Sequence, residues 1–201
     1  METRATHTHL STRQKLLDAA EDLMLSKGYV AASIDEICGS AGVTKGSFFH
    51  HFACKEELGK VLLLHFGHKQ LAAMQSAISA LEDPLDRVYA LLDVCADRCR
   101  DATMRGCLIG TFAQEISETH PMLRDVCGAC FRHLAAAVAA DLALAQARHA
   151  PRVDVDPAGL ADCLVALIQG SLLLQRATTD VEVMGRNLCH FKSLLRTSFG
   201  R

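Results

Sequence analysis

The sequence has no tryptophan and only four prolines, and aromatic residues make up just 5% of its 201 residues. Half of the chain is nevertheless hydrophobic, with alanine and leucine abundant. Because alanine and leucine favour helices, whereas aromatic and β-branched residues favour strands, this composition predicts an all-α protein. The apolar content is sufficient for a substantial hydrophobic core.

Long uninterrupted apolar stretches are also missing. Residues 1–14 do not include the apolar core of a signal peptide, and the most apolar stretches are interrupted by Asp141 or by Gln169 and Gly170. These absences predict a soluble, cytoplasmic protein with no membrane partner. The nine cysteines are odd in number and occur without a secretion signal, so we expect reduced thiols.

Recognisable catalytic motifs are absent: there is no Walker loop, no Gly-x-Ser-x-Gly elbow and no His-Glu-x-x-His motif. Glu115, Glu118 and His120 are close in sequence. Two glutamates three residues apart on a helix are, however, typical of a solvated face or a pocket edge. We therefore expect neither enzymatic activity nor a cofactor.

Local capping signals predict three helices near the N-terminus. A capping box that starts at Ser11 predicts a helix over 12–27. A second capping box, at Ser33, opens a short helix that ends near Gly39, and Thr44 can cap a third short helix. These helices define a small head over residues 1–53.

The remaining chain, residues 54–201, has the apolar periodicity of helices throughout. Pro84, Pro121 and Pro157 each lie where a first-turn proline belongs. The pattern predicts a larger helical body and about nine helices in all. The six expected in the body cover residues 55–81, 84–100, 107–119, 121–148, 157–176 and 181–197.

The second and third helices have the features of a helix-turn-helix, in which two short helices are joined by a tight glycine-containing turn. The net charge of −2 does not indicate nucleic-acid binding. Residues 39–55, however, contain two lysines, two histidines and no carboxylate, which favours DNA locally. The alternative is a helical hairpin with a merely solvated basic face.

Three segments resemble the signature of the TetR family: SIDEIC over 33–38, AGVTKGSFFHHF over 41–52 and KEEL over 55–58. The resemblance covers about residues 10–60. It implies that Thr44, Lys45, Ser47 and Phe49 approach bases or neighbouring sugar-phosphate, and that His51 and Lys55 contact backbone phosphate. The candidate DNA-binding residues are Thr44, Lys45, Gly46, Ser47, Phe48, Phe49, His51 and Lys55.

Two positions depart from the family pattern, because the family usually has Tyr where this chain has Phe49 and often Ser where it has Cys54. Phenylalanine can touch a thymine methyl group but cannot donate a hydrogen bond to phosphate. Cysteine is a poorer helix cap than serine. We therefore expect an operator sequence that differs from that of typical members.

The resemblance also implies a homodimer. The helices expected over 157–176 and 181–197 have wide apolar faces, and in TetR-like proteins the last two long helices form a four-helix bundle with their twofold mates. Residues 157–198 are thus the expected dimer interface, with purely intramolecular packing as the alternative. A dimer would place two recognition helices about 34–36 Å apart, as a palindromic operator requires.

Within the body, residues 105–117 resemble a branch of the family that includes the N-ethylmaleimide-responsive repressors. Cys107 begins a helix there, where the helix dipole and Arg105 lower a thiol pKa, so it is a candidate reactive thiol. The alternative is a buried structural cysteine beside a pocket for a neutral organic inducer. The candidate ligand or sensor residues are Cys107, Phe112, Cys127, Cys130 and Arg176.

Metal binding is a weaker alternative. Cys127, Cys130 and His133 are three residues apart on one helix, but the two cysteines also fit an apolar stripe, so no metal site is assigned. The sequence therefore predicts a repressor that binds a palindromic operator in double-stranded DNA as a homodimer. A small-molecule inducer in the C-terminal domain would release it, with electrophile or redox sensing through Cys107 as the alternative signal.

Overall fold

The computed structural model describes residues 11–101 and 105–200, and all regular secondary structure within these ranges is helical. This confirms the all-α prediction. The helices are α1 (Thr12–Lys27), α2 (Ile34–Ala41), α3 (Lys45–His51), α4 (Lys55–Ile78), α5 (Pro84–Arg100), α6 (Leu108–Ile116), α7 (Pro121–His149), α8 (Pro157–Thr178) and α9 (Val183–Phe199).

The three head helices begin after the predicted capping residues Ser11, Ser33 and Thr44. The Ser11 hydroxyl accepts a hydrogen bond from the Gln14 amide at 3.2 Å, and Ser33 and Glu36 form a reciprocal capping box. The Gln14 side chain, however, binds Asp18 and does not complete a capping box at Ser11. Capping therefore accounts for the starts of the head helices, because each cap satisfies a backbone N–H that would otherwise have no partner.

Some helix ends differ from the predictions. Helix α4 ends at Ile78, and α6 is shorter than the expected 107–119. At the end of α6 the amides of Thr119 and His120 both bond to the carbonyl of Ile116, which turns the chain before Pro121. A proline disfavours a helical conformation at the preceding residue, so α6 cannot run on into α7.

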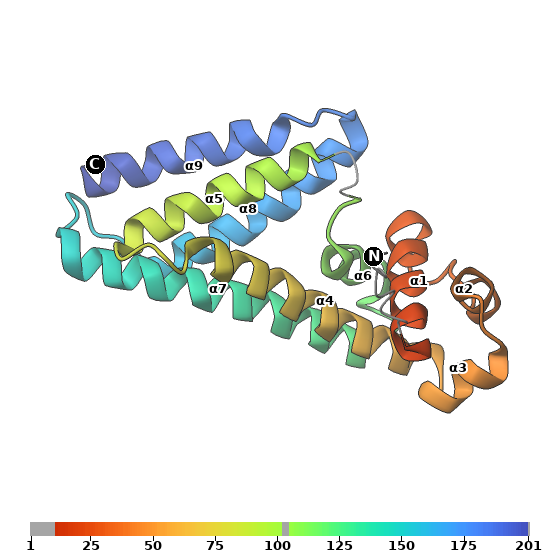
Figure 1. The fold of residues 1–201 in the computed structure, drawn as a ribbon. Coiled ribbons are helices and arrows are strands. Elements are labelled where there is room, and N and C mark those ends of the chain that lie inside the picture. Colours follow the sequence, from red (N-terminus) through yellow and green to blue (C-terminus); the bar gives the residue numbers. More distant parts are fainter. Residues whose placement is uncertain (1–10, 102–104, 201) are drawn as a thin grey trace, which may run out of the picture.

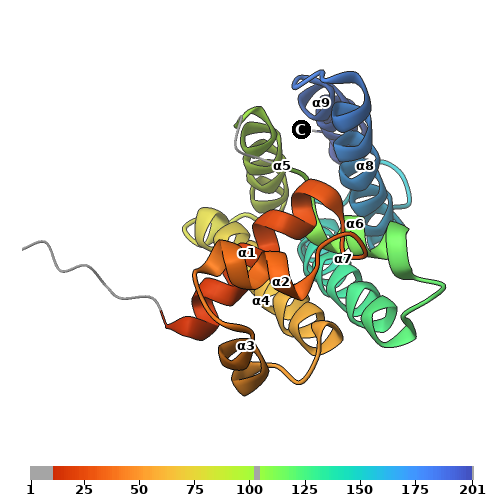
Figure 2. The same ribbon diagram turned by 90° about the vertical axis from the view of Figure 1, so that its right-hand side faces the viewer.

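The head, α1–α3, lies at one end of an elongated molecule (Figure 1). Helix α4 leads from the head into the body alongside α7, while α5, α8 and α9 form the distal part (Figures 1 and 2). The short α6 lies between the head and the rest of the body, next to α1. Because α1 contacts both α4 and α6, a displacement of either helix would change the position of the head.

Two hydrophobic clusters hold the fold together. The first joins α1–α3 to α4, α6 and the start of α7, so Leu16 and Phe52 of the head share a core with Leu62 and Phe112 of the body. The second lies between α5, α7, α8 and α9. The first core therefore crosses the predicted boundary between residues 53 and 54.

Helices α7 and α8 are each long and apolar enough to cross a membrane, judged by length and composition alone. They pack against one another and contribute to the second core. Asp141 of α7 also accepts hydrogen bonds from Arg87 of α5, which is unfavourable in lipid but ordinary in a water-soluble bundle. Packing within the body thus buries part of their apolar surface, while other apolar side chains, such as Leu144 and Leu174, remain exposed.

Candidate functional site

The turn between α2 and α3 sets the position of the third helix. Gly42 ends α2 in the left-handed conformation, with φ of 66°, and its N–H bonds to the carbonyls of Cys38 and Gly39. Thr44 then caps α3 by accepting a hydrogen bond from the Ser47 amide at 3.2 Å. Glycine suits this turn because other residues rarely adopt positive φ.

Most of the candidate DNA-binding residues on α3 face solvent. Thr44, Lys45, Gly46 and Phe49 are exposed, and the Phe49 ring is 53% exposed although it is apolar. The Lys45 ammonium pairs with Asp35 of α2 at 2.7 Å, at a site open to solvent on both sides. An exposed ion pair of this kind is weak, so Lys45 can exchange Asp35 for another anion.

Phe48 does not belong to this exposed surface. Its side chain is fully buried and packs on Phe52, with ring centroids 5.8 Å apart. The prediction that the Phe48 side chain contacts DNA is therefore wrong, because one face of the seven-residue helix α3 packs against the core of the head. His51 is half-buried beside this core.

Lys55, which is expected to contact DNA phosphate, is bonded to backbone carbonyls of the head in this structure. Its ammonium donates hydrogen bonds to the carbonyls of Tyr29 (3.0 Å), Val30 (3.3 Å) and Ala32 (3.1 Å). It also lies 4.5 Å from the centroid of the Tyr29 ring, and burial lowers its pKa. Lys55 thus holds the α1–α2 connection to α4 and does not extend towards solvent.

Glu115 forms a second link between head and body. Its carboxylate accepts hydrogen bonds from the backbone amides of Tyr29, at 2.6 Å, and Val30, at 2.9 Å. The spacing of Glu115 from Glu118 predicts a solvated face or a pocket edge, and it gives no sign of a partner 86 residues away. The carboxylate ties α6 to the end of α1.

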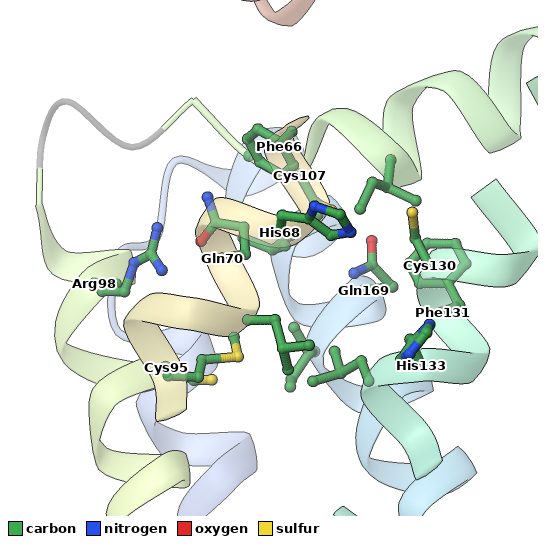
Figure 3. A pocket seen from close by; sticks show the side chains of 18 of the residues that line it. Phe66, His68, Gln70, Cys95, Arg98, Cys107, Cys130, Phe131, His133 and Gln169 are labelled. Atoms are coloured by element: carbon green, nitrogen blue, oxygen red, sulfur yellow. The ribbon is translucent and has the colours of Figure 1, made fainter. Parts of the chain in front are cut away.

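A cavity of about 230 Å³ lies between α4, α5, α7 and α8 (Figure 3). Its wall is mostly apolar and includes four thiols, which belong to Cys95, Cys99, Cys107 and Cys130. The polar side chains in the wall are those of His68, Gln70, Arg98, His133 and Gln169. Ligand sites typically combine an apolar wall with a few polar groups in this way.

A second, more polar cleft lies between the C-terminal end of α1, α6 and α8. Lys27, Glu115 and Arg176 line it, and Arg176 donates to the carbonyl of Leu25 at 3.3 Å. The cavity and the cleft share part of their walls, and the shared residues are Gly106, Cys107, Gln169 and Leu172. Cys107 is therefore close to both spaces.

The five candidate ligand or sensor residues do not lie together. Cys107 and Cys130 line the cavity and Arg176 lines the cleft, whereas Phe112 and Cys127 line neither. Phe112 is fully buried with its ring centroid 5.1 Å from that of Tyr29, and burial raises the pKa of Cys127 to about 12. Phe112 and Cys127 thus belong to the core, which their helical spacing alone could not reveal.

The environment of Cys107 differs from the expectation of a lowered pKa. Burial raises its pKa, and this effect outweighs hydrogen bonds from the Gly110 amide and the Gln169 side chain, which favour the thiolate. Arg105 does not assist, because its guanidinium lies 3.8 Å from the carboxylate of Asp22. Desolvation therefore dominates over the helix N-terminus at this thiol.

Metal ligation finds no support in the described part of the chain. No group of three or more His, Cys, Asp or Glu side chains there is arranged to hold a metal ion. His133 and Cys130 both line the cavity, but Cys127 points into the core. The spacing along α7 thus reflects packing, and no metal site is assigned.

The chain matches two family descriptions. Residues 16–70 match bacterial regulatory proteins of the tetR family, and residues 84–191 match the tetracyclin repressor-like C-terminal domain. Similar proteins include the transcriptional repressor NemR of Escherichia coli K12, 27% identical over 195 residues that cover 95% of this chain and 97% of NemR. The repressor DhaR of Mycobacterium sp. strain GP1 is 30% identical over 88% of both chains.

Solved structures agree with these matches. The reduced form of E. coli NemR has a TM-score of 0.80 and 25% identity, covering 90% of this chain and 96% of that one. A TetR regulator from Chloroflexus aurantiacus has a TM-score of 0.85 at 24% identity over 93% and 95% of the two chains, which shows the shared fold. The helix-turn-helix, the helical body and these likenesses together establish that the chain belongs to the tetR family of DNA-binding transcriptional regulators.

Proposed function

We propose that this regulator represses transcription by binding a palindromic operator as a homodimer, and that a small molecule in the cavity of the body releases it. The observation that carries the proposal is the pairing of an exposed α3 with a cavity whose wall adjoins α6. Because Glu115 of α6 binds the end of α1, a shift of α6 changes the orientation of the head.

Operator binding can be tested by selecting duplexes from genomic DNA and measuring their affinity by fluorescence anisotropy. Affinity should fall steeply with salt, because phosphate contacts release counterions. Ser47→Ala and Lys45→Ala should change the preference among operator variants, whereas Lys60→Ala on the exposed side of α4 should not. A protein with no preference for any duplex would contradict the proposal.

The proposed dimer interface is the outer face of α8 and α9. Leu173, Leu174 and Leu194 are 53%, 47% and 50% exposed there, which favours burial against a second copy. Leu174→Lys should yield a monomer in analytical ultracentrifugation, and Leu174 is chosen because Leu173 also lines the cleft. The matched control is Leu144→Lys on α7, since Leu144 is 55% exposed but lies outside this face, and it should leave the dimer intact.

A second candidate signal is modification of Cys107 by an electrophile or oxidant. The position of this thiol in the wall shared by cavity and cleft favours it, because an adduct there would push on α6. The test compares operator release by a mild electrophile in the parent protein, in Cys107→Ser and in Cys54→Ser, which changes an exposed thiol. If Cys107→Ser responds as fully as the parent, the sensor is not Cys107.

A further inference from the structure

The cavity in the body has charged side chains of only one sign. Its described lining contains one guanidinium, that of Arg98, together with His68 and His133, and no Asp or Glu. A cationic ligand would find no counter-charge in this wall. An anion would find one fixed positive charge, because arginine stays protonated throughout the physiological pH range.

Arg98 differs from the two other arginines of α5 in its surroundings, as far as the described residues go. Arg87 pairs with Asp141 at 2.5 Å, and Arg100 pairs with Asp97 and Glu182. Among the residues that the structure describes, no carboxylate lies within 4.0 Å of the Arg98 guanidinium. A half-buried guanidinium beside apolar walls gains more from an anion than an exposed one does.

The charge of Arg98 is felt across the cavity. It lowers the pKa of the thiols of Cys95, Cys99 and Cys107, although burial has the larger, opposite effect on all three. Figure 3 shows Arg98 and Gln70 on one side of the cavity and Cys130, Phe131 and His133 on the other. The positive charge therefore lies at one end of a space whose remaining wall is largely apolar.

The size of the cavity limits the ligand. Its volume of about 230 Å³ corresponds to about eight waters, since one water takes roughly 30 Å³ in the liquid, which suits a ligand of roughly ten non-hydrogen atoms. A single guanidinium balances a single negative charge. Its planar fork matches the two oxygens of a carboxylate, whereas a phosphate dianion would keep an uncompensated charge in an apolar space.

We propose that the cavity binds a small amphipathic monocarboxylate, with its carboxylate on Arg98 and its apolar part against α7 and α8. Leu134 of α7 and Ile168 and Leu172 of α8 provide the apolar surface. The proposal rests on the proposed function in one respect, namely that this cavity receives the signal. It adds the chemical class of the ligand and the residue that selects it.

Isothermal titration of the full-length protein without DNA tests this assignment. The probes are octanoate, octanol and octylammonium, which share one apolar chain and differ in charge. Octanoate should bind more tightly than octanol, and octylammonium should bind most weakly. Arg98→Gln should weaken octanoate about 10- to 100-fold, the range for a hydrogen bond to a charged group, and leave octanol unchanged. The matched control is Arg132→Gln, because Arg132 is exposed on α7 and does not line the cavity.

Several results would overturn the assignment: no octanoate binding at millimolar concentration, octylammonium as the tightest probe, or equal loss of octanoate affinity in Arg98→Gln and Arg132→Gln. Measuring operator affinity with octanoate present separates this inference from the proposed function. Binding that depends on Arg98 without any change in operator affinity would support the ligand class and contradict ligand-driven release. Equal operator release by octanol and octanoate would support ligand-driven release and contradict the assignment of a carboxylate ligand.

Discussion

Gly28 lies at the point where the head meets α6, and its replacement by alanine tests the strength of that junction. Gly28 ends α1 with φ of 89° and ψ of 168°, a conformation that is essentially restricted to glycine. A Cβ atom at this position would lie 2.6 and 2.8 Å from the two carboxylate oxygens of Glu115. The substitution therefore strains the backbone and displaces the carboxylate from the amides of Tyr29 and Val30.

The expected cost of Gly28→Ala follows from these two effects. Backbone strain costs about 1–3 kcal/mol. Loss of the two hydrogen bonds to Glu115 adds about 1 kcal/mol, reduced from the usual value because this carboxylate is exposed. The lower entropy of the unfolded alanine chain offsets about 0.5 kcal/mol. The free energy of unfolding should therefore fall by about 1.5–3.5 kcal/mol.

Urea unfolding followed by far-UV circular dichroism measures this change, at one protein concentration because the proposed dimerisation would make stability depend on concentration. The matched control is Gly39→Ala, since Gly39 lies in α2 with no atom within 4 Å of an added Cβ, and it should stabilise by about 0.5–1 kcal/mol. In a double-mutant cycle, Glu115→Ala should relieve part of the cost of Gly28→Ala. Additive effects within about 0.5 kcal/mol would refute the clash.

Three further predictions concern the head and the thiols. Lys55→Ala should lower the free energy of unfolding by about 1–3 kcal/mol, because three backbone carbonyls lose their hydrogen-bond donor. An unchanged urea midpoint together with weaker DNA binding would instead indicate that Lys55 acts only as a phosphate ligand. Hydrogen bonds from Lys27 and Ser33 hold the pKa of Glu36 at about 2, so its stabilising effect is complete above pH 4.5 and is lost as the pH falls towards 2. Glu36→Gln should flatten the dependence of the urea midpoint on pH in that window, and parallel curves would contradict the capping role. Maleimide should modify the exposed Cys54 before Cys107 at neutral pH, because burial raises the pKa of Cys107, and peptide mass mapping locates the adducts. Earlier modification of Cys107 would contradict its burial.

Local signals account for the parts of this fold that could be predicted from the sequence. The caps at Ser33 and Thr44 depend on residues three positions away, so they are visible in the chain and determine where α2 and α3 begin. The family signature likewise lies within one short segment. Phe48 shows the limit of that signature, because which side of a short helix is buried depends on the helices that pack against it, here α1 and α2.

The junction and the cavity could not be predicted in the same way. Glu115 reaches amides 86 and 85 residues away. Arg98 stands out only because its neighbours on α5 pair with carboxylates, whereas no carboxylate of the described residues lies within 4.0 Å of its guanidinium. The place of Cys107 at the start of a helix predicts a lowered thiol pKa, but burial by other helices decides the sign of the shift and raises the pKa. Long-range contacts of this kind leave no periodic pattern in the sequence.

The hydrophobic core that crosses residues 53 and 54 has a consequence for protein engineering. A head cut at that boundary would separate Leu16 and Phe52 from the body residues of the same core, among them Leu62 and Phe112. To transfer the operator preference of this regulator to a different body, the first turns of α4 and the inner face of α6 therefore have to be transferred together with α1–α3. The unit that can be exchanged between regulators is therefore the shared core, which is built from segments that are not contiguous in the sequence.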